Sequence, residues 1–157
     1  MGYFPAAEGG NDSPVCYRCL THMKTWELME KGCTVDALVK HELWLHEQES
    51  RLLFTHPPSF PCRGLVVIID ISHMTMKQAT KDIFSIFAGF AHASKPHHPE
   101  RLSKLYVVGA PRLFSVVWKM LVVFIPRQTY HKIEILSSFD HHPFLSVWMK
   151  KVQVQDA

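Results

Sequence analysis

The sequence predicts an α/β fold in which a mostly parallel sheet is flanked by helices. Three largely apolar segments, residues 65–69, 105–108 and 133–136, have the composition of strands, and helical patterns separate them. The first is a β-branched run without polar alternation, which is typical of a strand covered on both faces of a parallel sheet. Parallel neighbours need crossovers, which are almost always right-handed, so this alternation of strands and helices predicts the fold class.

Two helices are expected around the first strand. Before it, Thr34 or Asp36 can cap a helix over residues 37–53, where leucines recur every seven residues and form a buried stripe. After it, apolar residues at helical spacing predict an amphipathic helix over residues 76–90. Both helices are expected to pack on the sheet.

Two further signals mark helix starts. Thr75 with Gln78 three residues later can form a capping box for the helix over residues 76–90. Pro111 stands where a first-turn proline is tolerated, and it opens an almost entirely apolar helix over residues 113–125.

The chain has the length of one domain with a sizeable core. Residues 1–24 carry Gly, Pro, Asn and Asp with little periodicity, so a loose tail is expected there. The domain would occupy residues 25–157. A short strand over residues 25–28 would begin it, and a short amphipathic helix after Pro143 would end it.

The charge balance excludes one class of partner. With 17 basic and 14 acidic residues the net charge is +3, which favours an anionic membrane surface weakly and is too small to indicate nucleic acid. The first twelve residues do not resemble a secretory signal. The longest apolar run, residues 113–125, is shorter than the roughly 17–25 residues of a membrane span. We therefore expect a cytoplasmic protein with reduced cysteines and transient peripheral membrane association.

An ordered set of residues between positions 64 and 136 is more specific than composition. A strand that ends in aspartate is followed by a helix, a Pro-Glu-Arg turn, a strand, Ala-Pro, an apolar helix, and a Thr and a Lys before the last strand. These residues are Asp70, Pro99, Glu100, Arg101, Ala110, Pro111, Trp118, Phe124, Thr129, Lys132 and Ile133. In this order and spacing they resemble the CRAL-TRIO lipid-binding domain of the phosphatidylinositol-transfer type.

The resemblance implies a lipid carrier that uses no cofactor and no metal. Acyl chains would fill an apolar pocket, and the helix over residues 113–125 would lie in a mobile gate. The residues expected to line the pocket and the gate are Leu113, Phe114, Val117, Trp118, Leu121 and Phe124. Glu100, Thr129 and Lys132 would bind the headgroup, since a phosphate needs a cation and hydroxyl donors, and inositol hydroxyls need a carboxylate. The expected ligand is phosphatidylinositol, exchanged at a membrane surface.

Several departures from the family pattern lead us to expect a truncated, partial domain. A loose tail stands where the family carries a helical lobe, and the family's closing Leu-Pro and Gly-Gly do not follow Leu136. Leu65 and Val67 occupy the positions where members that also carry phosphatidylcholine have hydroxyls, so a choline headgroup is not expected. His73 replaces the family's glycine after the aspartate.

Other interpretations stay open. The domain can be a regulatory module that binds proteins and transfers no lipid, with Glu100 and Lys132 as ordinary surface charges and the apolar helix as static core. Asp70 can serve a turn or a helix cap. Cys16 and Cys19 fit no standard zinc spacing, and the sequence contains no nucleotide-binding loop or nucleophile elbow, so an enzyme is not expected.

Overall fold

The centre of the molecule is one five-stranded sheet in the order β1-β2-β3-β4-β5. The computed structural model describes residues 2–4, 15–20, 24–54, 64–75, 78, 80–94, 102–112 and 114–155. The strands are β1 (Gly2–Phe4), β2 (Val15–Cys19), β3 (Leu65–Asp70), β4 (Leu102–Val108) and β5 (Ile133–Leu136). Strands β2 to β5 are parallel, and β1 pairs antiparallel with β2. The mostly parallel sheet predicted from the sequence is confirmed.

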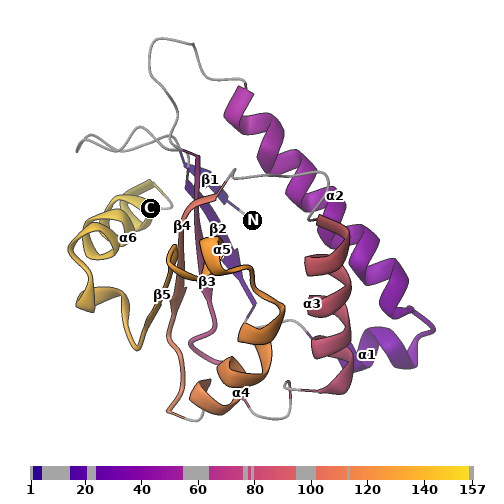
Figure 1. Ribbon diagram of the computed structural model, residues 1–157. Coiled ribbons are helices and arrows are strands. Elements are labelled where there is room, and N and C mark those ends of the chain that lie inside the picture. The colour runs from indigo at the N-terminus through magenta and orange to yellow at the C-terminus, as the bar shows by residue number, and fades with distance from the viewer. Residues whose placement is uncertain are drawn as a thin grey trace.

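The helices lie on both faces of this sheet. They are α1 (Thr25–Glu30), α2 (Val35–Phe54), α3 (Lys81–Ser94), α4 (Phe114–Leu121), α5 (Arg127–Tyr130) and α6 (Pro143–Gln155), with short 3₁₀ helices η2 (Val122–Phe124) and η3 (Phe139–His141). Because the parallel strands follow one another in chain order, right-handed crossovers place the connecting helices on the same face. Figure 1 shows α2, α3 and α4 on that face and α6 on the other.

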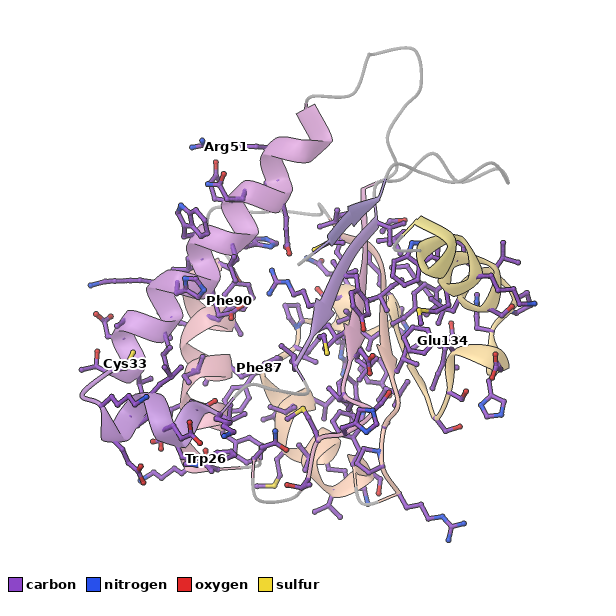
Figure 2. All side chains as sticks on the ribbon, turned by 180° about the vertical axis from the view of Figure 1, so that it is seen from behind. Trp26, Cys33, Arg51, Phe87, Phe90 and Glu134 are labelled. Carbon is purple, nitrogen blue, oxygen red and sulfur yellow. The ribbon has the colours of Figure 1, made fainter. Side chains whose placement is uncertain are left out.

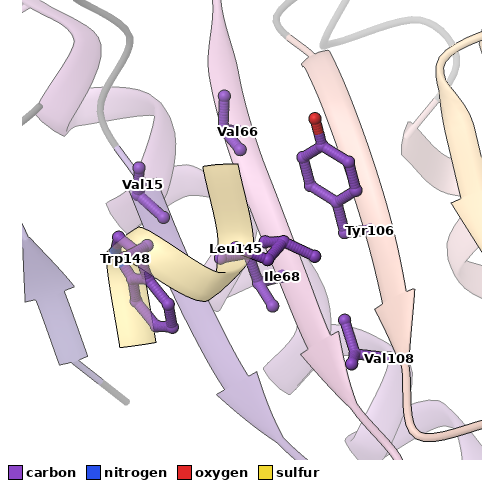
Figure 3. Packing of buried hydrophobic residues seen from close by; sticks show 7 residues of the cluster. All are labelled: Val15, Val66, Ile68, Tyr106, Val108, Leu145 and Trp148. Atoms are coloured by element: carbon purple, nitrogen blue, oxygen red, sulfur yellow. The ribbon is translucent and has the colours of Figure 1, made fainter. Parts of the chain in front are cut away.

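The best-packed part of the core lies between the sheet and α6. Leu145 and Trp148 of α6 cover one row of side chains from three strands, as Figure 3 shows. That row consists of Val15, Val66, Ile68, Tyr106 and Val108. The helix expected after Pro143 is therefore confirmed, and it closes the face that the crossover helices leave open.

The expected loose tail over residues 1–24 contains two strands, so that prediction was wrong for β1 and β2. Strand β2 pairs with β3 along its whole length, and Val15 and Cys16 are buried. The strand is hard to recognise because Arg18 interrupts a five-residue segment that would otherwise be apolar. Its charge is tolerated because acidic residues of α2 neutralise it in the fold.

The expected strand over residues 25–28 is instead the short helix α1, because its amides bond backwards to Lys24. The helix ends in a Schellman motif, in which the Gly32 amide donates to Met29 O and the Cys33 amide to Leu28 O. Gly32 has a φ of +87°, which favours glycine at this position. Four residues of alternating polarity could not distinguish a strand from one helical turn.

The predicted pairing of Thr75 with Gln78 exists, but it lies ahead of helix α3 and does not cap that helix. The Thr75 amide donates to Oε1 of Gln78 at 2.6 Å in the loop after β3. Helix α3 begins later, at Lys81, and the hydroxyl oxygen of Thr80 accepts from the Ile83 amide there. The predicted amphipathic helix is thus confirmed over α3. It begins at Lys81, later than expected, and Thr80 caps it in place of Thr75.

Candidate functional site

A cavity of about 500 Å³ lies between the sheet and the helices α2, α3 and α4. Val67, Leu105 and Ile133 stand side by side on β3, β4 and β5 and form part of its floor. Phe87 and Phe90 line the opposite wall, and Figure 2 shows both on the side of α3 that faces the sheet. An apolar surface of this kind binds hydrocarbon through the area removed from water, at about 25 cal/mol per Å².

Helix α4 and η2 form one side of the cavity. Of the pocket and gate residues predicted from the sequence, those that line the cavity are Phe114, Val117, Trp118, Leu121 and Phe124. Leu113 lies outside the described residues. Ring contacts hold this side together, since Trp118 stacks between Phe114 and Tyr130, and Phe124 meets Phe87 of α3.

The outer side of the same segment is also apolar. Val116, Met120 and Val123 are 54%, 51% and 73% exposed, although a core helix would hide such residues. None of the eight residues of α4 is fully buried. The segment therefore presents one apolar face to the cavity and another to the surroundings, and its attachment depends on side-chain contacts within the cavity wall.

The short helix α5 brings two of the predicted headgroup residues to the cavity. Thr129 bonds through its amide to Pro126 O, and the Lys132 amide donates to Thr129 O, both at 2.9 Å. Both side chains line the cavity. The Lys132 ammonium donates to Leu102 O at 2.7 Å, which uses one of its three donors. Glu100, the third predicted headgroup residue, lies outside the described residues.

A charged cluster that was not expected from the sequence lies between β2 and α2. It consists of Cys16, Arg18, Glu42, His46 and Glu49, and we call it the Arg18 cluster. Nε of Arg18 donates to Oε1 of Glu49 at 2.7 Å, and Nη1 donates to Oε2 of Glu42 at 2.9 Å. The Cys16 thiol donates to the same Glu49 oxygen at 2.9 Å, and Nδ1 of His46 lies 3.6 Å from the other. Arg18, His46 and Glu49 line the cavity.

The electrostatics of the cluster favour the charged forms of Glu49 and Arg18. Glu49 is 2% exposed, and although burial acts to raise the pKa of its carboxyl, His46, Arg18 and Cys16 together lower it. Burial, with the Glu49 charge, raises the pKa of the Cys16 thiol to about 12. Cys16, considered above as a zinc ligand, is therefore a protonated hydrogen-bond donor. The described residues include no group of three or more His, Cys, Asp or Glu side chains that could hold a metal ion.

One sequence signal could have indicated this cluster. Glu42, His46 and Glu49 follow one another at spacings of four and three residues, which puts them on one face of α2. An arginine within an apolar strand needs an acidic partner, and such a row supplies two. The partners are separated by 24 and 31 residues, so no local pattern joins them.

Asp70 stabilises a turn at the end of β3, which is one of the two roles that the sequence suggested for it. Its carboxylate accepts from the Ser72 amide and hydroxyl at 2.9 and 2.6 Å, and from the Tyr17 hydroxyl at 2.8 Å. Burial acts against the charge, but these donors lower the pKa of Asp70. Ser72 packs directly on Gly109, whose φ is +74°, so a larger residue would collide there.

The model of the CRAL/TRIO domain matches residues 6–150. The chain belongs to the CRAL/TRIO family. The crystal structure of Sfh5 has the same fold, with a TM-score of 0.71 and 22% identity over 86% of this chain and 46% of that one. The CRAL-TRIO fold predicted from the sequence is confirmed.

Curated relatives of this CRAL/TRIO domain are SEC14-type proteins. The chain is 28% identical to the SEC14 cytosolic factor of Candida glabrata over 114 residues, which are 70% of this chain and 37% of that protein. It is 25% identical to the phosphatidylinositol/phosphatidylcholine transfer protein SFH11 of Arabidopsis thaliana over 111 residues, 68% of this chain and 29% of that protein. The chain thus spans 37% and 29% of the length of these two relatives. Among its described helices, none has the length and apolarity to cross a bilayer.

Proposed function

We propose that this domain binds a phospholipid, with a preference for phosphatidylinositol, and carries it between membranes in the cytoplasm without making or breaking a bond. The observation that carries the proposal is the apolar cavity closed on one side by α4 and η2. Acyl chains need such a surface, removed from water, and few polar groups. The name of the Arabidopsis relative supports the same class of ligand.

Thr129 and Lys132 are suited to the phosphate of such a lipid. Both line the cavity on α5 and directly before β5, and the ammonium keeps donors beyond its bond to Leu102 O. A phosphate oxygen that accepts from an ammonium and a hydroxyl forms charge-assisted hydrogen bonds. Glu100 remains the predicted acceptor for inositol hydroxyls, on the strength of the family resemblance.

The segment of α4 and η2 is the proposed gate and the proposed membrane contact. Its outer side carries Val116, Met120 and Val123, and the exposed cations Lys119 and Arg127 lie close by in the sequence. Apolar side chains next to cations favour the surface of an anionic membrane. Movement of the segment at that surface would open the cavity to an entering acyl chain.

Retention of lipids tests the ligand class. The protein, incubated with vesicles of equal phosphatidylinositol and phosphatidylcholine and then separated from them, should carry phosphatidylinositol in roughly tenfold excess, the value of one charge-assisted bond. Leu65 and Val67 are buried and offer no hydroxyl to a choline headgroup. Extraction and mass spectrometry give the ratio. Equal amounts would contradict the headgroup assignment, and retention of neither lipid would favour a regulatory module that binds proteins.

Lys132→Ala tests the phosphate contact. Loss of a partly buried charged donor should weaken phosphatidylinositol binding by roughly tenfold or more. Lys104→Ala is the matched control, because Lys104 pairs with Glu134 at 3.2 Å and does not line the cavity. Binding is measured by titration with a fluorescent phosphatidylinositol. If the two variants bind equally well and only the melting temperature of Lys132→Ala falls, Lys132 has a structural role alone.

A further inference from the structure

The cavity has two polar regions, and the proposed headgroup contacts explain only one of them. Thr129 and Lys132 lie on α5 and before β5, whereas Arg18 lies on β2. Three strand spacings separate β2 from β5, which is roughly 14 Å across the sheet. This distance is close to the length of one acyl chain, about half of a bilayer's 30 Å hydrocarbon core. A lipid held by its head at Lys132 can therefore place the far part of a chain beside the Arg18 cluster.

The Arg18 cluster retains hydrogen-bonding capacity at the cavity wall. Among the residues that the structure describes, its contacts with Glu42 and Glu49 use three of the five N–H groups of the guanidinium. His46 adds a ring at the same wall, held against Phe90 by an edge-on contact. A plain hydrocarbon chain would remove water from these groups without replacing its hydrogen bonds, which costs free energy.

The charge of the cluster decides which group fits there. The two carboxylates of Glu42 and Glu49 outnumber the one guanidinium of Arg18, which leaves an excess of one negative charge among these three groups. A second phosphate or a carboxylate would be repelled by this charge. A hydroxyl is uncharged, and it can accept from the guanidinium and donate to a carboxylate or to the imidazole.

We propose that the Arg18 cluster is a second polar subsite of the cavity, which takes a hydroxyl group on the acyl chain of the bound lipid. The preferred ligand would be a phospholipid with a hydroxylated chain. This inference rests on the proposed lipid-binding function and adds to it the chemistry of the chain. Lys132 and Thr129 hold the head, and Arg18, His46 and Glu49 meet the oxygen in the far part of the chain.

A competition between two lipids tests the subsite. The protein is offered equal amounts of phosphatidylinositol with an octadecanoyl chain and phosphatidylinositol with a 12-hydroxyoctadecanoyl chain, and the retained ratio is measured by mass spectrometry. The hydroxylated lipid should be retained in roughly tenfold excess, since it restores a hydrogen bond to a charged group. A ratio of one with both lipids retained would overturn the subsite and leave the proposed function intact. Retention of neither lipid would overturn both.

The double variant Arg18→Met/Glu49→Met tests whether the Arg18 cluster causes the preference for the hydroxylated lipid. Replacement of both partners by apolar residues of similar length removes the guanidinium together with its most buried carboxylate, leaves only the more exposed Glu42, and is commonly tolerated by the fold. Its ratio should fall to about one, whereas the Lys104→Ala control, with its substitution away from the cavity, should keep the excess. An unchanged tenfold excess in the double variant would overturn the assignment. If the double variant does not fold, the wild-type ratio still decides the proposal.

Discussion

Glu49→Met alone is expected to destabilise the fold by about 3–5 kcal/mol, because it leaves the Arg18 guanidinium in a buried position without its main partner. Glu49 accepts from both Arg18 and Cys16, and it is almost completely buried. Its remaining acidic neighbour, Glu42, reaches only one of the guanidinium nitrogens in the structure. Denaturant unfolding followed by circular dichroism measures the change.

Two further variants serve as controls for Glu49→Met. Arg18→Met/Glu49→Met should be much closer to the wild type than Glu49→Met, because the buried guanidinium is removed together with its main partner and only the more exposed Glu42 loses a partner. Glu42→Met removes the more exposed carboxylate and should cost no more than about 1 kcal/mol. A Glu49→Met protein with wild-type stability would show that water solvates the Arg18 guanidinium. It would contradict the burial of the Arg18 cluster.

Leu145→Ala is expected to lower the free energy of unfolding by about 2–5 kcal/mol. Leu145 is 0% exposed and lies on α6 against Ile68 and Val108, as Figure 3 shows, so its truncation leaves a cavity between helix and sheet. Val147→Ala on the same helix is the control. Val147 is 53% exposed, and its loss should change stability by less than about 0.5 kcal/mol. Chemical denaturation of both variants gives the two values.

The position of Leu145 also separates stability from binding. Helix α6 lies on the opposite face of the sheet from the lipid cavity, and Leu145 does not line that cavity. The folded fraction of Leu145→Ala should therefore bind phosphatidylinositol as the wild type does. Similar losses in Leu145→Ala and Val147→Ala would contradict the packing of α6 on the sheet.

The distribution of the helices over the two faces of the sheet explains why one face is closely packed and the other borders a cavity. All crossover helices lie on one face because strand order follows chain order. There α2 and α3 pack mainly on each other, and polar contacts from Arg18 and Cys16 reach Glu49 across the gap between α2 and β2. Helix α6 packs on the other face with Leu145 and Trp148. The cavity therefore follows from the topology.

The amino-acid sequence by itself determined the elements whose local pattern is strong. The run of β3 is apolar up to Asp70, residues 105–108 of β4 are apolar, and β5 is apolar except for Glu134. Helices α2 and α3 carry their apolar residues at helical spacing. From these, the parallel sheet and the fold class follow. The family resemblance added the cavity residues of α4 and η2, together with Thr129 and Lys132.

Only the tertiary structure decided the rest, because the deciding contacts join residues far apart in the chain. Strand β2 is stable with Arg18 inside it because Glu42 and Glu49, 24 and 31 residues later, neutralise its charge. The place of α6 depends on a row of side chains from three separate strands. A local pattern records the preference of a segment for helix or strand, whereas charge pairing and burial across the sheet exist only once the chain has folded.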